Sequence, residues 1–164
     1  MCTVPQLTDL DLTGIDTVAI DLETYDPNLK SKGLGAVRKD GFVTGIAIAT
    51  KNQTLYFPIA HAMTDNLNVN DTWEYLDEKL FKNKDIRKVF HNAMYDVCWI
   101  RSAIGHMPQG QLLDTMIAAS VIDETRMRYS LDAISKDYLK ESKYKYDLAE
   151  KSLAECGIKD PMSN

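Results

Sequence analysis

Residues 17–23 restrict the fold of this chain more than any other segment, because they combine the pattern of a buried strand with two acidic residues. Apolar side chains occupy every second position, at Val18, Ile20 and Leu22. This period of two predicts a β-strand with one apolar face. Asp21 and Glu23 then point to the opposite face, roughly 7 Å apart along the strand. Because the strand has the composition of a central one, these charges need a cation or another partner to offset their burial.

Three antiparallel strands are expected at the start of the chain. After the first strand, residues 26–41 are rich in Gly and Lys and are interpreted as a loop. Residues 42–50 and 54–59 have strand patterns, and 51–53 fit the hairpin turn between them. The three strands together form one side of a sheet.

Strands and helices alternate in the rest of the chain. A helix with Trp73, Leu76 and Leu80 at helical spacing begins at Asn70 or Asp71, either of which can cap it. The later elements are, in order, a strand at 88–91, a helix at 93–104 between a cap at Asn92 and a stop at Gly105, a strand at 112–113, helices at about 115–122 and 131–139, and an amphipathic stretch at about 144–155. This order predicts an α/β fold, a mixed sheet flanked by helices.

The composition fits one soluble globular domain covering residues 1–164. With 45% hydrophobic and 26% charged residues, the chain is too apolar to be disordered. Its longest apolar runs fall well short of the ~20 residues that cross a membrane, so we expect no membrane partner and a cytoplasmic location. Three cysteines without a CxxC pair indicate neither a disulfide framework nor a thiolate zinc site.

The charge limits how nucleic acid could be bound. A net charge of -5 argues against extended electrostatic binding of a duplex. A shorter contact stays open, because four basic residues follow the first strand: Lys30, Lys32, Arg38 and Lys39. They could bind phosphates there, although a solvated loop explains them more simply.

A second segment with chemical potential is the hexamer His91-Asn92-Ala93-Met94-Tyr95-Asp96. With Asn92 as the helix cap, Asp96 falls about one turn into the helix, where the helix dipole favours a carboxylate. Asn92 and Tyr95 lie one turn apart on neighbouring faces. Taken singly, the hexamer and the acid pair have simple structural explanations: solvated acids, a cap and a packed ring.

Together these segments resemble the N-terminal proofreading domain of bacteriophage DNA polymerases of the polymerase I type, which belongs to the four-carboxylate exonuclease superfamily. Asp21-Leu22-Glu23-Thr24 is similar to its first motif, and the hexamer at 91–96 to its second. Three further landmarks are Tyr25-Asp26-Pro27-Asn28-Leu29, Leu113-Asp114-Thr115-Met116 and Tyr129-Ser130-Leu131-Asp132. The resemblance covers about residues 15–145.

The resemblance implies an RNase H-like fold and a 3′-5′ exonuclease that hydrolyses the terminal phosphodiester of single-stranded DNA. Two Mg²⁺ or Mn²⁺ ions would hold the attacking and leaving oxygens, and carboxylates are the ligands that such ions prefer. By the same resemblance, Asp21 bridges both ions, Glu23 holds one ion and orients the water, and Asp96 binds the second ion through its shell.

The resemblance also implies a nucleotide-binding set. Asn92 and Tyr95 contact the terminal nucleotides, and Leu22 and Thr24 lie beside the last sugar or base. Asp114 is expected to fix the local backbone rather than bind metal, because it opens a helix as a capping acid does.

The chain departs from the family at the third motif, a Tyr followed a few residues later by the fourth metal-binding Asp. Tyr146 and Glu150 have similar spacing, but they come too soon after Ser130 and end in Glu. We therefore expect the isolated chain to be slow or inactive, and a polymerase domain or another polypeptide to supply the missing motif. Two alternatives stay open: an inactive nucleic-acid-binding module and an RNA 3′-5′ exonuclease, since readout of the 2′-hydroxyl is not visible in a sequence.

Overall fold

The computed structural model of this protein describes residues 4–62 and 64–139. These residues fall into two compact units, with the division between Ile117 and Ala118. The single domain expected over 1–164 stays a prediction, because residues 140–164 lie outside the described part. The expected amphipathic stretch at 144–155, with Tyr146 and Glu150, lies there too.

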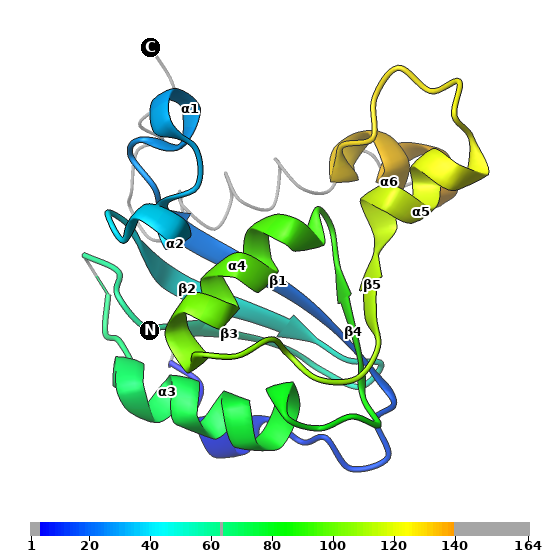
Figure 1. Ribbon diagram of the computed structural model, residues 1–164. Helices are drawn as coiled ribbons and strands as arrows, with labels where there is room; N and C mark the ends of the chain where they lie inside the picture. Colours follow the sequence, from blue (N-terminus) through cyan, green and yellow to red (C-terminus); the bar gives the residue numbers. More distant parts are fainter. Residues whose placement is uncertain (1–3, 63, 140–164) are drawn as a thin grey trace, which may run out of the picture. The chain divides into compact units, whose positions relative to one another are not determined.

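The first unit contains a five-stranded mixed sheet in the order β3-β2-β1-β4-β5 (Figure 1). Its strands are β1 Thr17–Tyr25, β2 Phe42–Ala49, β3 Thr54–Pro58, β4 Arg87–Phe90 and β5 Leu112–Asp114. β1, β2 and β3 pair antiparallel, whereas β1, β4 and β5 pair parallel. The expected antiparallel start and the mixed sheet are confirmed, and β1 is the central strand.

The described helices are η1 Leu7–Asp9, α1 Leu29–Lys32, α2 Gly35–Arg38, α3 Val69–Leu76, the π-turn η2 Asp77–Phe81, α4 Ala93–Ile104, α5 Thr115–Ile122 and α6 Leu131–Leu139. The expected helices at 93–104, 115–122 and 131–139 are confirmed. The interpretation of residues 26–41 as a loop was wrong in part, because the segment contains α1 and α2. One-turn helices are too short to leave an apolar period in the sequence.

The hydrophobic core lies on one face of the sheet, beneath α3 and α4. Val18, Ile20 and Leu22 of β1 are buried, as the alternation predicted. They pack in one cluster with helix residues that include Leu76, Trp99 and Ile100. Figure 1 shows α4 crossing in front of the sheet on this side. Burial of these side chains is the main source of stability and fixes α4 against β1.

The cap of α3 lies two to three residues before the expected one. The Asn68 side chain accepts hydrogen bonds from the amides of Asn70 and Asp71, at 2.9 and 3.1 Å. The expected cap at Asn70 or Asp71 was therefore wrong. The helix begins with an exposed turn that the apolar pattern does not mark.

The second unit contains the end of α5 and all of α6. Ser130 caps α6, since its hydroxyl accepts from the amide of Ala133 at 3.4 Å. The Tyr129 hydroxyl donates to the carbonyl of Asp123 at 2.7 Å and fixes the turn before the helix. None of the helices in the described residues is long and apolar enough to cross a membrane.

Candidate active site

Asp21 and Glu23 lie on the face of β1 opposite the core, and both are exposed. Their partners across the antiparallel pair are Ala47 and Gly45. Directly opposed residues of a sheet share one face, so the two acids are flanked by the smallest side chains available. Two exposed carboxylates therefore stand on one sheet face, opposite an alanine and a glycine.

Asp96 comes to the same strand from α4. The pairing of β1 with β4 covers residues 17–19 of β1, after which β4 ends and the chain turns into α4. The amide of Leu22 lies beyond this pairing and donates to Asp96 Oδ1 at 3.1 Å. The Asp96 carboxylate thus takes the place of a strand neighbour beside the residue that separates Asp21 from Glu23.

The surroundings of Asp96 favour its neutral form. The side chain is 3% exposed, and this burial raises the pKa of Asp96 to about 7. The hydrogen bond from Leu22 opposes the shift, while the negative charges of Asp21 and Asp114 add to it. Burial and nearby negative charges both raise the pKa of this carboxyl group. A cation bound beside it would therefore be strongly favoured.

Asp114 ties the ends of two helices to β5. Its carboxylate accepts from the amides of Asn92 and Ala93 at the start of α4, at 3.1 and 2.8 Å. It also accepts from the amides of Met116 and Ile117 at the start of α5, at 2.8 and 3.4 Å. Burial by itself would raise the pKa of Asp114, but the four donors together lower it. The expected backbone role of Asp114 is observed.

Asn92 occupies the cap position of α4 without acting as a side-chain cap. Its backbone is left-handed, with φ 66° and ψ 54°, and its side chain makes no capping hydrogen bond to the described residues. The expected cap was therefore wrong, because the carboxylate of Asp114 already bonds the first free amides of the helix. The Asn92 side chain is exposed.

Thr24 and Tyr95 meet between β1 and α4. Their hydroxyl oxygens lie 2.6 Å apart, and the Tyr95 ring packs edge-on against Trp99 at 6.4 Å. Leu22, by contrast, packs its side chain in the core. The structure thus brings Thr24 and Tyr95 together near the acids, and Leu22 takes part through its amide.

His91 adjoins the second motif and is bound within the fold. Thr115 donates its hydroxyl to the carbonyl of Phe90 at 3.1 Å, so its oxygen is free to accept from His91 Nδ1 at 2.9 Å. His91 is thereby a structural residue at the end of β4.

The acids do not form a ready metal cluster. Within residues 4–62 and 64–139, no three Asp, Glu, His or Cys side chains are gathered closely enough to hold a metal ion. The donor chemistry nevertheless fits Mg²⁺ or Mn²⁺, since Asp21, Glu23 and Asp96 offer oxygen alone. The metal-binding and nucleotide-binding roles stay predictions.

Sequence reasoning missed Tyr56 and Gly45. Ala47 pairs with both Asp21 and Tyr56, so Tyr56 lies on the same sheet face as the acids. Its ring covers Gly45, the residue opposite Glu23. The sequence places both residues on predicted strands. The register that brings them close to Glu23 is visible only in the folded sheet.

The fold is of the RNase H-like exonuclease class: a mixed sheet with paired acids on its central strand and a third acid on the helix that follows β4. Residues 7–164 match the family model described as 3′-5′ exonuclease, and the chain belongs to that family.

Phage DNA polymerases are among its relatives. The chain is 34% identical to the DNA-directed DNA polymerase of Pseudomonas phage M6 over 128 residues, 75% of this chain and 19% of the polymerase. It is 32% identical to DNA polymerase DpoZ of Salmonella phage PMBT28 over 133 residues, 80% of this chain and 19% of that polymerase. The resemblance to the exonuclease domain of phage polymerases is confirmed, and the chain spans about a fifth of the length of these relatives.

Solved structures confirm the fold. Brucella melitensis NrnC bound to pGG matches with a TM-score of 0.60 and 26% identity, over 80% of this chain and 56% of that one. Brucella melitensis NrnC with bound Mg²⁺ matches with a TM-score of 0.59 and 26% identity, over 82% of this chain and 59% of that one. Trypanosoma brucei RNase D in complex with GMP matches with a TM-score of 0.66 and 19% identity, over 92% of this chain and 43% of that one. At 19% identity, this match supports the fold alone.

Proposed function

We propose that this chain is the proofreading 3′-5′ exonuclease domain of a phage DNA polymerase, and that it hydrolyses the 3′-terminal phosphodiester of single-stranded DNA. Membership of the exonuclease family gives the reaction class. The observation that supports the site is the hydrogen bond from Leu22 to Asp96, which holds the buried acid beside the strand of Asp21 and Glu23.

Asp21, Glu23 and Asp96 would hold two Mg²⁺ or Mn²⁺ ions. When bound, such ions supply an activated water and positive charge at the leaving oxygen. Glu23 stands on the open face of β1 and orients the attacking water. The raised pKa of Asp96 supports this assignment, since burying that acid is unfavourable without a positive neighbour. NrnC, a similar structure, has been solved with bound Mg²⁺.

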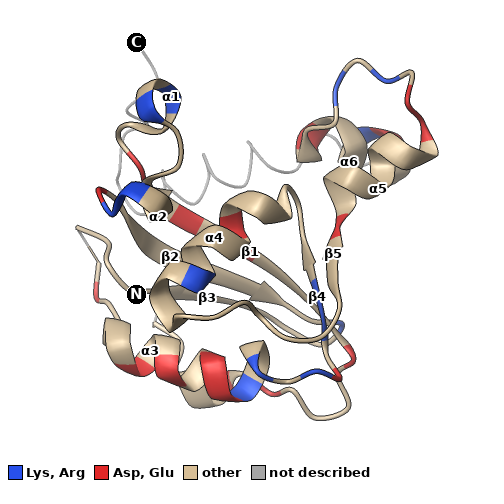
Figure 2. Cartoon of the chain, viewed as in Figure 1, with Lys and Arg blue, Asp and Glu red and all other residues tan. Residues whose placement is uncertain are grey.

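The terminal nucleotides lie, in this proposal, over the end of β1. Tyr95 and Thr24 meet there through their hydroxyls, and Asn92 is exposed at the start of α4. α1 and α2 follow β1 directly and carry Lys and Arg (Figure 2). Arg38 is already paired with Asp26 and Asp40. Lys30, Lys32 and Lys39 are therefore the better candidates for a phosphate contact.

The partner is a polymerase domain or another polypeptide that supplies the third motif. Two observations support this proposal: residues 1–164 contain no Tyr-x-x-x-Asp sequence, and the chain matches about a fifth of the length of phage DNA polymerases. We expect the chain alone to cleave slowly, and an appended segment with a Tyr-x-x-x-Asp helix to raise the rate by orders of magnitude.

The test uses a 5′-labelled single-stranded DNA with Mn²⁺, for the chain alone and with the appended segment. We expect a ladder of products shortened from the 3′ end, and its loss in Asp21→Ala. Asp85→Ala is the matched control, because Asp85 is exposed and lies away from the site. Cleavage that Asp21→Ala leaves intact would contradict the proposed site.

The same assay separates the two alternatives. Oligonucleotide binding without cleavage at any Mn²⁺ or Mg²⁺ concentration, even with the appended segment, would identify an inactive binding module. Faster shortening of an RNA strand of the same sequence would identify an RNA exonuclease.

A further inference from the structure

The ring of Tyr56 lies in a space that exists because residue 45 is glycine. A Cβ built on Gly45 would stand 1.9 Å from the Tyr56 hydroxyl oxygen and 2.3 Å from the ring carbon that carries it. Gly45 is also the residue directly opposite Glu23 in the sheet. Opposed Cβ positions are about 5 Å apart, so the hydroxyl lies within side-chain reach of Glu23.

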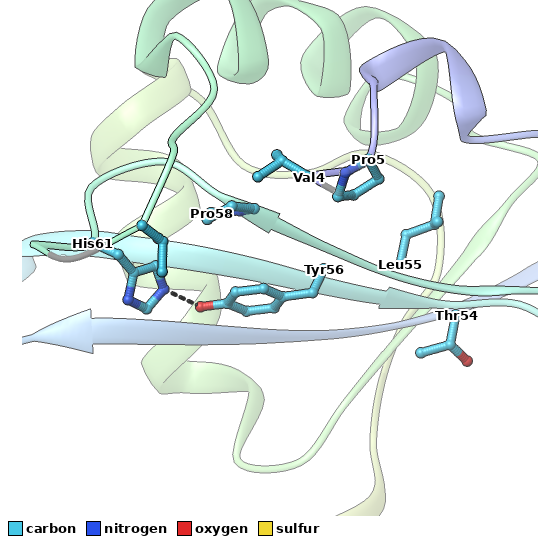
Figure 3. Close-up of a pocket in the computed structure, with 8 residues that line it drawn as sticks. Val4, Pro5, Thr54, Leu55, Tyr56, Pro58 and His61 are labelled. Carbon is cyan, nitrogen blue, oxygen red and sulfur yellow. Dashed lines mark hydrogen bonds between the residues drawn. The ribbon is translucent and has the colours of Figure 1, made fainter. Parts of the chain in front are cut away.

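His61 holds the hydroxyl in this position. Its Nε2 lies 2.5 Å from the Tyr56 oxygen, and Figure 3 shows the two side chains pointing toward each other. The backbone of His61 is fixed in turn by the Asn66 amide group, which accepts from its N–H and donates to its carbonyl, both at 2.8 Å. The pair is therefore a built arrangement rather than a chance contact of two exposed rings.

The ring needs such a partner, because it borders an open hollow. A cavity of about 460 Å³ lies along β3, lined by Val4, Pro5, Leu55 and Pro58 together with Tyr56 and His61. Figure 3 shows these residues around the edge of the strand. Without His61, the Tyr56 ring would have space to rotate away from Gly45.

The electrostatics agree with a hydroxyl that faces Glu23. Burial raises the pKa of Tyr56, and the negative charge of Glu23 raises it further. The phenol thus keeps its proton at neutral pH and can act as a hydrogen-bond donor.

We propose that Tyr56, held by His61 and admitted by Gly45, is a positioning residue that orients the Glu23 carboxylate for metal binding. His61 donates its Nε2 proton to the phenol oxygen, and the phenol O–H is then free to donate to Glu23, directly or through one water. This inference rests on the proposed function. Hydrogen-bonding partners of ligating carboxylates typically change metal affinity or activity by about 10- to 100-fold.

The test measures Mn²⁺ affinity of the full chain by calorimetry, with free Mn²⁺ followed by its paramagnetic resonance. We expect Tyr56→Phe, which keeps the ring and removes the hydroxyl, to weaken Mn²⁺ binding about tenfold. His61→Ala and Gly45→Ala should act in the same direction. Tyr75→Phe is the matched control, on α3, and should stay within about twofold of the wild type. The melting temperature of metal-free Tyr56→Phe should equal that of Tyr75→Phe.

The outcomes separate this inference from the proposed function. If Glu23→Gln weakens Mn²⁺ binding but Tyr56→Phe binds like the wild type, the role of Tyr56 is wrong and the metal site stands. If Glu23→Gln also has no effect, or the wild type binds no Mn²⁺, the proposed site fails and the role of Tyr56 with it. An equal loss in Tyr75→Phe would likewise overturn the inference.

Discussion

The amide of Leu22 donates a hydrogen bond to the carboxylate of Asp96 at 3.1 Å, across 74 positions of sequence. The bond forms where β1 has lost its parallel neighbour β4 and the first turn of α4 lies in its place. A carboxylate that completes the hydrogen bonding of a strand is held rigidly. The same bond keeps the Asp96 carboxylate near Asp21, whose negative charge raises the pKa of Asp96.

The stability of the metal-free protein should fall as pH rises. Asp96 has its pKa raised from 3.8 to about 7, so the fold favours the protonated form. The contribution of Asp96 to the free energy of unfolding is fully present below its pKa in the unfolded chain, about 4. This contribution is lost as the pH rises through about 7. Asp96→Asn keeps an acceptor for Leu22 and cannot ionise, so it should melt higher than the wild type at pH 8. Thermal unfolding in EDTA from pH 5 to 8 measures this, and an equally steep decline in Asp96→Asn would contradict it.

Removal of metal should matter more at high pH than at low pH. A ligand that binds the folded state raises its stability with concentration, and Asp96 must be ionised to bind a cation. We expect millimolar Mn²⁺ to raise the melting temperature clearly at pH 8 and only slightly at pH 5. EDTA should reverse the increase. The same shift in Asp21→Asn as in the wild type would show that the stabilising ion binds elsewhere.

Asp114→Ala should destabilise the first unit, since four backbone amides lose their acceptor. Loss of a helix cap and the burial of unpaired donors suggest a cost of about 2 kcal/mol or more. Urea unfolding gives the free energy. Asp123→Ala is the comparison, because Asp123 accepts from Thr125 in its own turn. Equal costs for the two variants would mean that Asp114 does not fix α4.

Thr24 and Tyr95 should be coupled. Thr24→Val and Tyr95→Phe each remove one side of the 2.6 Å hydrogen bond, at a cost of about 1 kcal/mol. Either change alone already breaks the shared hydrogen bond. The double variant should therefore lose little more stability than either single variant. A double-mutant cycle of unfolding free energies checks this, and additive costs would show that the hydroxyls are not bonded.

The sequence pattern was sufficient where one residue type repeats with a clear period. The alternation around Asp21 predicted the central strand and its two faces, and the glycine at position 105 predicted where α4 ends. The motifs around these residues were sufficient to indicate the exonuclease family.

The rest depends on contacts between distant segments. Nothing near Asn92 indicates that Asp114 caps α4 in its place, because the two residues meet only when β5 lies beside β4. The approach of Tyr56 to Gly45, the residue opposite Glu23, needs the exact register of three strands. A period of two gives the face of a strand but not its alignment with the next.

The central claim is that Asp21, Glu23 and Asp96 share hard cations. Anomalous diffraction from crystals grown with Mn²⁺ tests it most directly, because it locates the ion independently of activity. We predict Mn²⁺ at roughly 2.0–2.3 Å from carboxylate oxygens of Asp21 and Glu23, with the Asp96 carboxylate facing a second ion through that ion's water shell. Mn²⁺ bound instead at the acidic residues of α3 and η2 (Figure 2), with no metal at Asp21, Glu23 and Asp96, would contradict this claim.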